Sequence, residues 1–149
     1  MSAFVTAGAG FLLAVLWFDL MFDVQVGRGP AGDLAETTLA SIAAYYARVT
    51  TAARPMNRLI ATAMLATLAA IVVEIANGLH HAWVPWASLA LALVPILLAG
   101  LRTVPSAVRL GTRRDSASMQ SQLARAILRQ HAFCFFCIGA LMLIQLTAG

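Results

Sequence analysis

The sequence predicts an all-α membrane protein, a bundle of four transmembrane helices with an additional amphipathic helix on the cytoplasmic side between spans one and two. Apolar residues make up 61% of its 149 residues and charged residues 11%, whereas about a quarter of the residues in soluble domains are charged. Its mean hydropathy is +0.84. Four apolar stretches approach the ~20 residues that cross ~30 Å of hydrocarbon. They cover approximately residues 4–26, 59–79, 83–101 and 131–146, and the length fits a single domain over 1–149.

The first apolar stretch, residues 4–26, is expected to stay in the membrane. No Lys or Arg precedes it and no cleavage signal follows it, so it differs from a signal peptide. Gly27, Gly29 and Pro30 predict the turn that ends this helix.

A shorter helix is expected over residues 34–53. Asp33 and Glu36 have the spacing of a capping box at its start. Larger apolar residues recur at helical spacing on one side of this segment, and polar residues fill the rest; the apolar ones are Leu39, Ile42, Tyr46 and Val49. This pattern is typical of a helix that lies at a membrane surface.

The second and third spans have recognisable ends. Pro55 marks the start of span two, because the residue before a proline avoids the helical region. Trp83 and Trp86 lie where an aromatic belt meets the membrane surface. Pro95 predicts a kink in span three, and a basic loop is expected over residues 102–115.

The fourth span belongs to a longer helix. Asp115 or Ser116 can cap a helix that is expected to run unbroken to about Leu146. At 1.5 Å per residue it would be ~45 Å long, so its first half would stand in the cytoplasm.

Arginine sets the predicted orientation. All ten basic residues are Arg, and they occur only in the two long connections and at the ends of the spans beside them. By the positive-inside rule both Arg-rich loops are cytoplasmic, and both termini lie outside. We therefore expect a multi-pass protein of a bacterial-type plasma (inner) membrane that contacts anionic lipid and binds no nucleic acid. The arginines are at positions 28, 48, 54, 58, 102, 109, 113, 114, 125 and 129.

Four ionisable side chains lie inside the predicted spans, where each costs roughly 2.5 to 3.5 kcal/mol at the bilayer centre. Asp19 and Asp23 are four residues apart, on one helix face, and lie towards the cytoplasmic end of span one. His131 opens span four at the same level. Glu74 lies near the outer end of span two, before His80 and His81, and whether these three form a second site is left open.

The topology predicts a polar pocket that opens to the cytoplasm. Asp19 and His131 are the candidate catalytic residues, because a carboxylate facing a histidine can accept or relay a proton. The candidate substrate-binding residues, with arginine holding an anionic oxygen, are Asp23, Asn57, Arg58 and Arg102. In the alternative interpretation the aspartates pair with arginine to lock the bundle. Asp19, which lies a turn deeper, has the stronger need of a partner.

Two cofactor interpretations are less well supported. Two aspartates and one histidine make a thin ligand set for iron, copper or manganese, and no E-x-x-H or H-x-x-x-H spacing is present, so we expect no metal and no other cofactor. Cys134 and Cys137 form a C-x-x-C pair, as in quinone reductases of the vitamin K epoxide reductase type. No second cysteine pair is present, and cytoplasmic thiols stay reduced. We interpret the pair as small apolar residues.

Over nearly its whole length the chain resembles the anthrone-oxygenase-like four-helix membrane proteins. The similar stretches are Asp19 and Asp23 near the end of span one, the aromatic and basic lead at residues 45–57, the polar exit of span three at 101–110 and the helix that delivers His131. The resemblance implies oxidation of polycyclic phenolic substrates without metal or flavin.

The chain also departs from that family. Asp23-Val24 replaces a His-Pro pair, and Pro105-Ser106 replaces a Thr-Asn pair. Because a fold does not fix a function, two classes stay open. The protein is either an enzyme or binder for a lipophilic, phenolic small molecule, or a non-catalytic subunit of a larger membrane complex or a homo-oligomer.

Overall fold

A computed structural model describes residues 2–27, 32–78 and 83–148 of the chain. Among these residues four helical segments are long and apolar enough to cross a membrane, which supports a multi-pass membrane protein. They are α1 (Ser2–Gly27), α3 (Arg54–Asn77), a third segment that combines α4 (Trp83–Leu98) with α5 (Val104–Thr112), and α6 (Ala117–Ala148). The predicted glycine turn at residues 29 and 30 lies outside the described residues.

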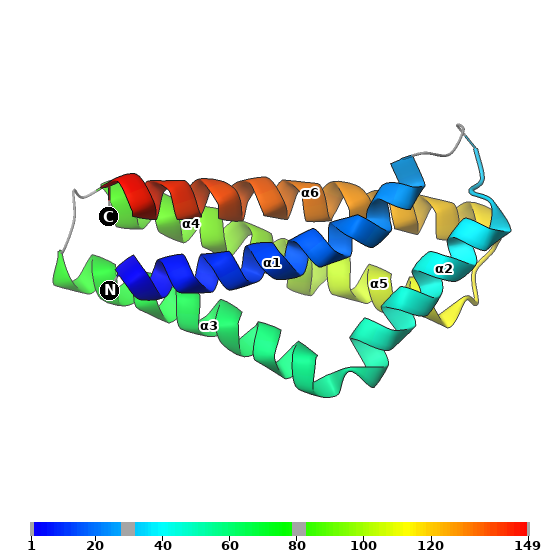
Figure 1. Cartoon of the computed structure of the whole chain (residues 1–149), viewed down its shortest axis with the longest axis horizontal. Helices are drawn as coiled ribbons and strands as arrows, with labels where there is room; N and C mark the ends of the chain where they lie inside the picture. The colour runs from blue at the N-terminus through cyan, green and yellow to red at the C-terminus, as the bar shows by residue number, and fades with distance from the viewer. Residues whose placement is uncertain (1, 28–31, 79–82, 149) are drawn as a thin grey trace.

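The four long segments pack side by side. α6 lies between α1 and α4, and α3 contacts both α1 and α4. Figure 1 shows the N- and C-termini at the same end of the bundle, as an even number of spans requires. α2 (Glu36–Ala47) lies near the opposite end.

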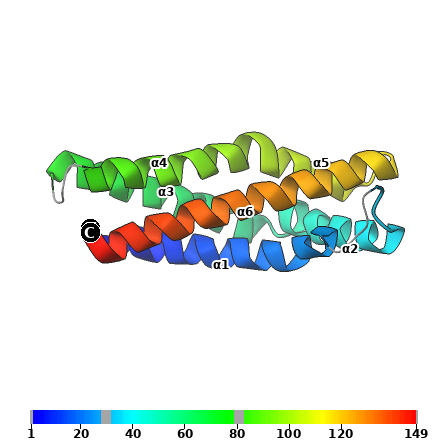
Figure 2. The same ribbon diagram turned by 90° about the horizontal axis from the view of Figure 1, so that it is seen from above.

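The third span differs from the prediction, because the expected loop over residues 102–115 is mostly helix. After α4 the backbone widens into a π-helical turn, η2 (Ala99–Thr103), and continues as α5. Pro105 interrupts nothing, since it occupies the first turn of α5, where a proline's missing N–H is not needed. Figure 2 shows α4 and α5 following one another along α6.

The long last helix was predicted correctly. Ser116 caps it, because its Oγ accepts a hydrogen bond from the backbone N–H of Met119 at 3.3 Å. Asp115 instead forms a two-bond ion pair with Arg109, with both N···O distances at 2.8 Å. At 1.5 Å per residue the 32 residues of α6 span about 48 Å, longer than the ~30 Å of hydrocarbon.

A helix also forms in the predicted 34–53 segment, but its start differs from the prediction. No side chain caps α2. Glu36 binds Arg113 at 2.6 Å, and the N–H of Leu34 donates to Ser121 Oγ at 2.9 Å. The helix is thus tied to α5 and α6.

α2 buries its apolar side in the protein. Leu39, Ile42 and Tyr46 are buried against α5 and α6, and the chain continues as a π-helical turn, η1 (Arg48–Ala52). A position of this helix at the membrane surface stays a prediction.

The apolar interior consists of two clusters. The first joins α1 to α3, α4 and α6. The second joins the end of α1 to α2, α5 and the first half of α6. His131 lies on α6 between Ile127 of the second cluster and Ile138 of the first, so the site described next is where the two apolar cores meet.

Candidate functional site

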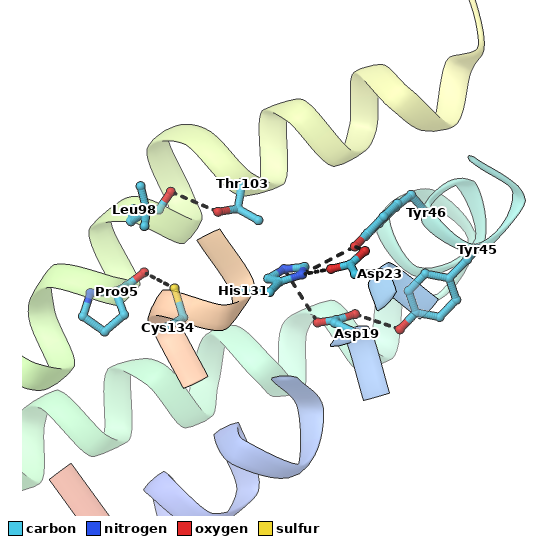
Figure 3. A network of polar contacts seen from close by, with 9 residues as sticks. All are labelled: Asp19, Asp23, Tyr45, Tyr46, Pro95, Leu98, Thr103, His131 and Cys134. Atoms are coloured by element: carbon cyan, nitrogen blue, oxygen red, sulfur yellow. Dashed lines mark hydrogen bonds and ion pairs between the residues drawn. The ribbon is translucent and has the colours of Figure 1, made fainter. Parts of the chain in front are cut away.

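His131 is the centre of a buried polar network. Its Nδ1 lies 2.6 Å from Oδ2 of Asp23, and its Nε2 lies 3.9 Å from Oδ2 of Asp19. Figure 3 shows the imidazole of α6 reaching both carboxylates of α1. A carboxylate is an acceptor only, so Nδ1 carries the hydrogen towards Asp23, and in the neutral ring Nε2 is then the free lone pair.

Two consecutive tyrosines of α2 complete the network. The Tyr46 hydroxyl donates to Oδ1 of Asp23 at 2.6 Å, and the Tyr45 hydroxyl donates to Oδ1 of Asp19 at 2.7 Å. The Tyr45 ring also stacks on Phe22, with centroids 3.9 Å apart and planes 12° from parallel. α2 therefore supplies one phenol to each carboxylate (Figure 3).

Both phenols stay protonated in this environment. Burial, followed by the charge of Asp23, raises the pKa of Tyr46 above its usual value. Burial and the charge of Asp19 raise the pKa of Tyr45 in the same direction. The two hydroxyls are thus permanent donors to the carboxylates and are not themselves bases at physiological pH.

The two aspartates differ in enclosure, and in the opposite sense to the prediction. Asp23 has 0% of its side chain exposed, whereas Asp19 has 18% exposed. The reason is α2. Its Tyr46 covers the end of α1, so the aspartate that seemed nearer to water has two direct bonds, and the deeper one is at the edge of the network.

The predicted cationic partners do not join the site. Arg58 and Arg102 are exposed, and within the described chain neither forms a hydrogen bond or ion pair with Asp19, Asp23 or His131. Asn57 donates through Nδ2 to the carbonyl oxygen of Thr50 at 3.0 Å, which stabilises η1. Of the predicted site residues, the structure brings together the two aspartates and the histidine.

The network geometry does not suit a single metal ion. The two nitrogens of His131 face different carboxylates, so one ion cannot be bound by the imidazole and both aspartates together. Within the described ranges, no group of three His, Cys, Asp or Glu side chains is arranged to hold a metal.

A second polar cluster lies in the other half of the bundle. The Gln145 amide nitrogen is 3.1 Å from Oε2 of Glu74 and 3.0 Å from Oγ of Ser88, and all three residues are buried. Glu74 therefore has Gln145 and Ser88 beside it. His80 and His81, the partners considered from the sequence, lie outside the described residues.

The cysteines are both free thiols. Cys134 is buried, and its Sγ is 3.7 Å from the carbonyl oxygen of Pro95. Cys134 thus packs against the proline-containing part of α4, in keeping with the interpretation as a small buried residue.

Sequence reasoning missed Tyr45, Tyr46 and Gln145. It searched for charged partners for the buried acids, whereas the structure uses neutral donors. The signal for Tyr46 was its place on the apolar side of the predicted helix, because a buried tyrosine hydroxyl usually needs a polar partner.

Comparison of the chain with protein-family models, curated proteins and solved structures gives no significant match. The resemblance to the anthrone-oxygenase-like proteins therefore rests on the residues quoted above, and the functional argument rests on the His131 network.

Proposed function

We propose that this multi-pass membrane protein binds a lipophilic phenolic molecule at His131 and removes its proton. The observation that carries the proposal is the unequal placement of the imidazole. Nδ1 is fixed at 2.6 Å by the enclosed Asp23, while Nε2 is 3.9 Å from the partly exposed Asp19. That second distance exceeds a direct hydrogen bond, so Nε2 is the basic atom on the accessible side.

The proton transfer follows from this arrangement. The phenolic O–H donates to Nε2, the O–H bond breaks, and the phenolate oxygen keeps the electron pair. The resulting imidazolium is stabilised by the carboxylate of Asp23, as a buried aspartate orients and stabilises a catalytic histidine in other enzymes. Asp19, held by Tyr45, lies beside the reacting atom and adds a negative charge that favours the charged ring.

An oxidation step would follow from the family resemblance alone. In it, a deprotonated anthrone-type substrate reacts with dioxygen. One oxygen atom becomes a new carbonyl in place of the methylene group, and the other leaves as water with the two methylene hydrogens. Neither Arg58 nor Arg102 belongs to the site, so stabilisation of the anionic substrate would come from the imidazolium.

We assign the site to the cytoplasmic side of a bacterial-type inner membrane, with both termini outside. The assignment rests on the distribution of arginine and on the shared end of the two termini (Figure 1). α2 would then cover the site from the cytoplasm.

The test uses 2-naphthol as a probe, because its neutral and deprotonated forms have different spectra. Protein in detergent is titrated with the probe, and the naphtholate fraction is measured for the wild type, His131→Gln and Asp23→Asn. We expect binding with deprotonation in the wild type, loss of deprotonation in His131→Gln, and a weaker base in Asp23→Asn. Arg114→Gln, at an exposed position far along the chain from the site, is the matched control.

A non-catalytic component of a larger membrane complex is the second candidate. It is favoured by the complete enclosure of Asp23, whose two oxygens are both bonded, as in a structural lock. If His131→Gln binds and deprotonates 2-naphthol as the wild type does, but unfolds more readily, the network is a lock and the proposed function is wrong.

A further inference from the structure

We propose that the phenolic ligand reaches His131 sideways from the lipid, through an opening between α1 and α3, and that the site therefore selects phenols with an apolar body dissolved in the bilayer. This inference rests on the proposed function and adds the route and the class of ligand. It replaces the cytoplasmic opening expected from the sequence.

The first observation is that α3 leaves the bundle on the side of the site. Gly8 of α1 and Thr67 of α3 are packed so closely that a Cβ on Gly8 would overlap the Thr67 side chain. From Pro55 to Ala66, however, no side chain of α3 is fully buried. Figure 1 shows α1 and α3 separating towards α2.

The second observation is the position of Asp19 relative to this separation. It is 11 residues, about three helical turns, beyond Gly8 along α1. The neighbours of α1 are α6, α3 and α2. α6 contributes His131 and α2 contributes Tyr45, so the remaining side of Asp19 faces the part of α3 that has moved away. This accounts for its 18% exposure.

The surroundings of the opening are apolar. Trp17, Phe18 and Met21 of α1 and Leu59 of α3 are all exposed, as expected of residues in contact with lipid tails. Ile60, two turns from Thr67, is half-buried and packs against the apolar cluster. An occupant must therefore combine an apolar body with one hydrogen-bonding group that reaches Asp19 and His131.

A closed cytoplasmic side supports the same route. Tyr46 is 2% exposed and Asp23 is 0% exposed, and both lie beneath α2. A ligand from the cytoplasm would have to displace α2 and break the bonds between its tyrosines and the aspartates. A ligand from the bilayer would break none of them.

The experiment uses protein in phosphatidylcholine nanodiscs and competition with bound 2-naphthol. The competitors are 4-decylphenol, which dissolves in the bilayer, and 4-hydroxybenzenesulfonate, a phenol that stays in water. We expect 4-decylphenol to displace the probe and the sulfonate to fail at about 100-fold higher concentration.

Two tryptophan substitutions test the opening itself. Ile60→Trp adds bulk towards α1, whereas Leu59→Trp adds the same bulk at the exposed neighbour. We expect Ile60→Trp to weaken 4-decylphenol binding about tenfold or more, and Leu59→Trp to change it by less than about twofold. Helix content and elution volume report whether each variant is folded.

The outcomes separate the two proposals. If the wild type binds no 2-naphthol, the proposed function fails. If the sulfonate competes as well as 4-decylphenol, or if Ile60→Trp binds 4-decylphenol like the wild type, the function stands and entry from the bilayer is refuted.

Discussion

The bond between Tyr46 and Asp23 is expected to stabilise the fold more than the similar bond between Tyr45 and Asp19. The two bonds have nearly the same length, 2.6 and 2.7 Å, and come from adjacent residues of one helix. They differ in burial, because Asp23 is fully enclosed while Asp19 is 18% exposed. The pair of substitutions Tyr46→Phe and Tyr45→Phe therefore isolates the effect of burial.

The magnitude follows from the state of the carboxylate that loses its donor. In Tyr46→Phe, Oδ1 of Asp23 has no solvent to replace the hydroxyl, and hydrogen bonds to charged groups contribute about 1.5 to 3 kcal/mol. In Tyr45→Phe, the partly exposed Asp19 has room to find another donor, so the expected loss is below about 1 kcal/mol. The phenyl ring is kept in both variants, so packing with Phe22 and α5 changes little.

The assay is reversible unfolding in mixed micelles, with the free energy of unfolding taken from far-UV circular dichroism. The double variant is included, because the two bonds share His131 and their effects are not expected to be additive. Equal losses for the two single variants would refute the assignment of Asp23 as the enclosed member of the network. A loss in Tyr45→Phe larger than in Tyr46→Phe would reverse it.

Three further predictions concern the phenols, the contact of α2 with α5, and the topology. The chain has only two tyrosines, so tyrosinate absorbance reports Tyr45 and Tyr46 directly; because their pKa values are raised, the folded protein should show no tyrosinate at pH 10 to 11. The unfolded chain loses these protons near pH 10, so the stability from the raised pKa values is complete below pH 10 and falls as pH rises above it. Early tyrosinate absorbance at full helix content would contradict the geometry. Gly111→Ala should lower the midpoint of thermal unfolding, because the new Cβ would lie 2.9 Å from the backbone nitrogen of Ala47, whereas Gly139→Ala has open space and should raise stability by up to about 1 kcal/mol. A C-terminal alkaline phosphatase fusion should be active and a C-terminal green fluorescent protein fusion dark, and the reverse result would invert the orientation.

The meeting of Asp19, Asp23 and His131 could be predicted from the sequence. A spacing of four residues puts the aspartates on one helix face, and antiparallel spans bring the end of the first to the level of the start of the fourth. Such a prediction needs only the helical period and the topology. It needs no knowledge of side-chain packing.

The contacts of α2 could not be predicted in the same way. Leu39, Ile42 and Tyr46 form an apolar side that fits a lipid surface and a protein interior equally well. The choice between them depends on α5 and the first half of α6, which stand beyond the hydrocarbon and offer an apolar surface of their own. The sequence pattern shows that a face is apolar, but not what covers it.

The arginines failed for a different reason. A π-helical turn holds one more residue than an α-helical turn, so it rotates every later side chain by about 100° relative to the expected face. Arg102 lies within η2, where counting in steps of 3.6 no longer predicts the facing side. Arg58 lies where α3 has separated from α1, so facing inwards there brings no contact with the site.

The asymmetry of the network favours proton transfer over a purely structural role. A lock needs each polar atom bonded as closely as its partner allows, and the Asp23 side meets that condition. The Asp19 side does not, because its carboxylate lies 3.9 Å from Nε2 although α1 and α6 pack closely there. A fixed tautomer on one side and a free lone pair on the other is what a general base requires. The basic atom also faces the one aspartate that is partly exposed, so the reactive side and the open side of His131 coincide.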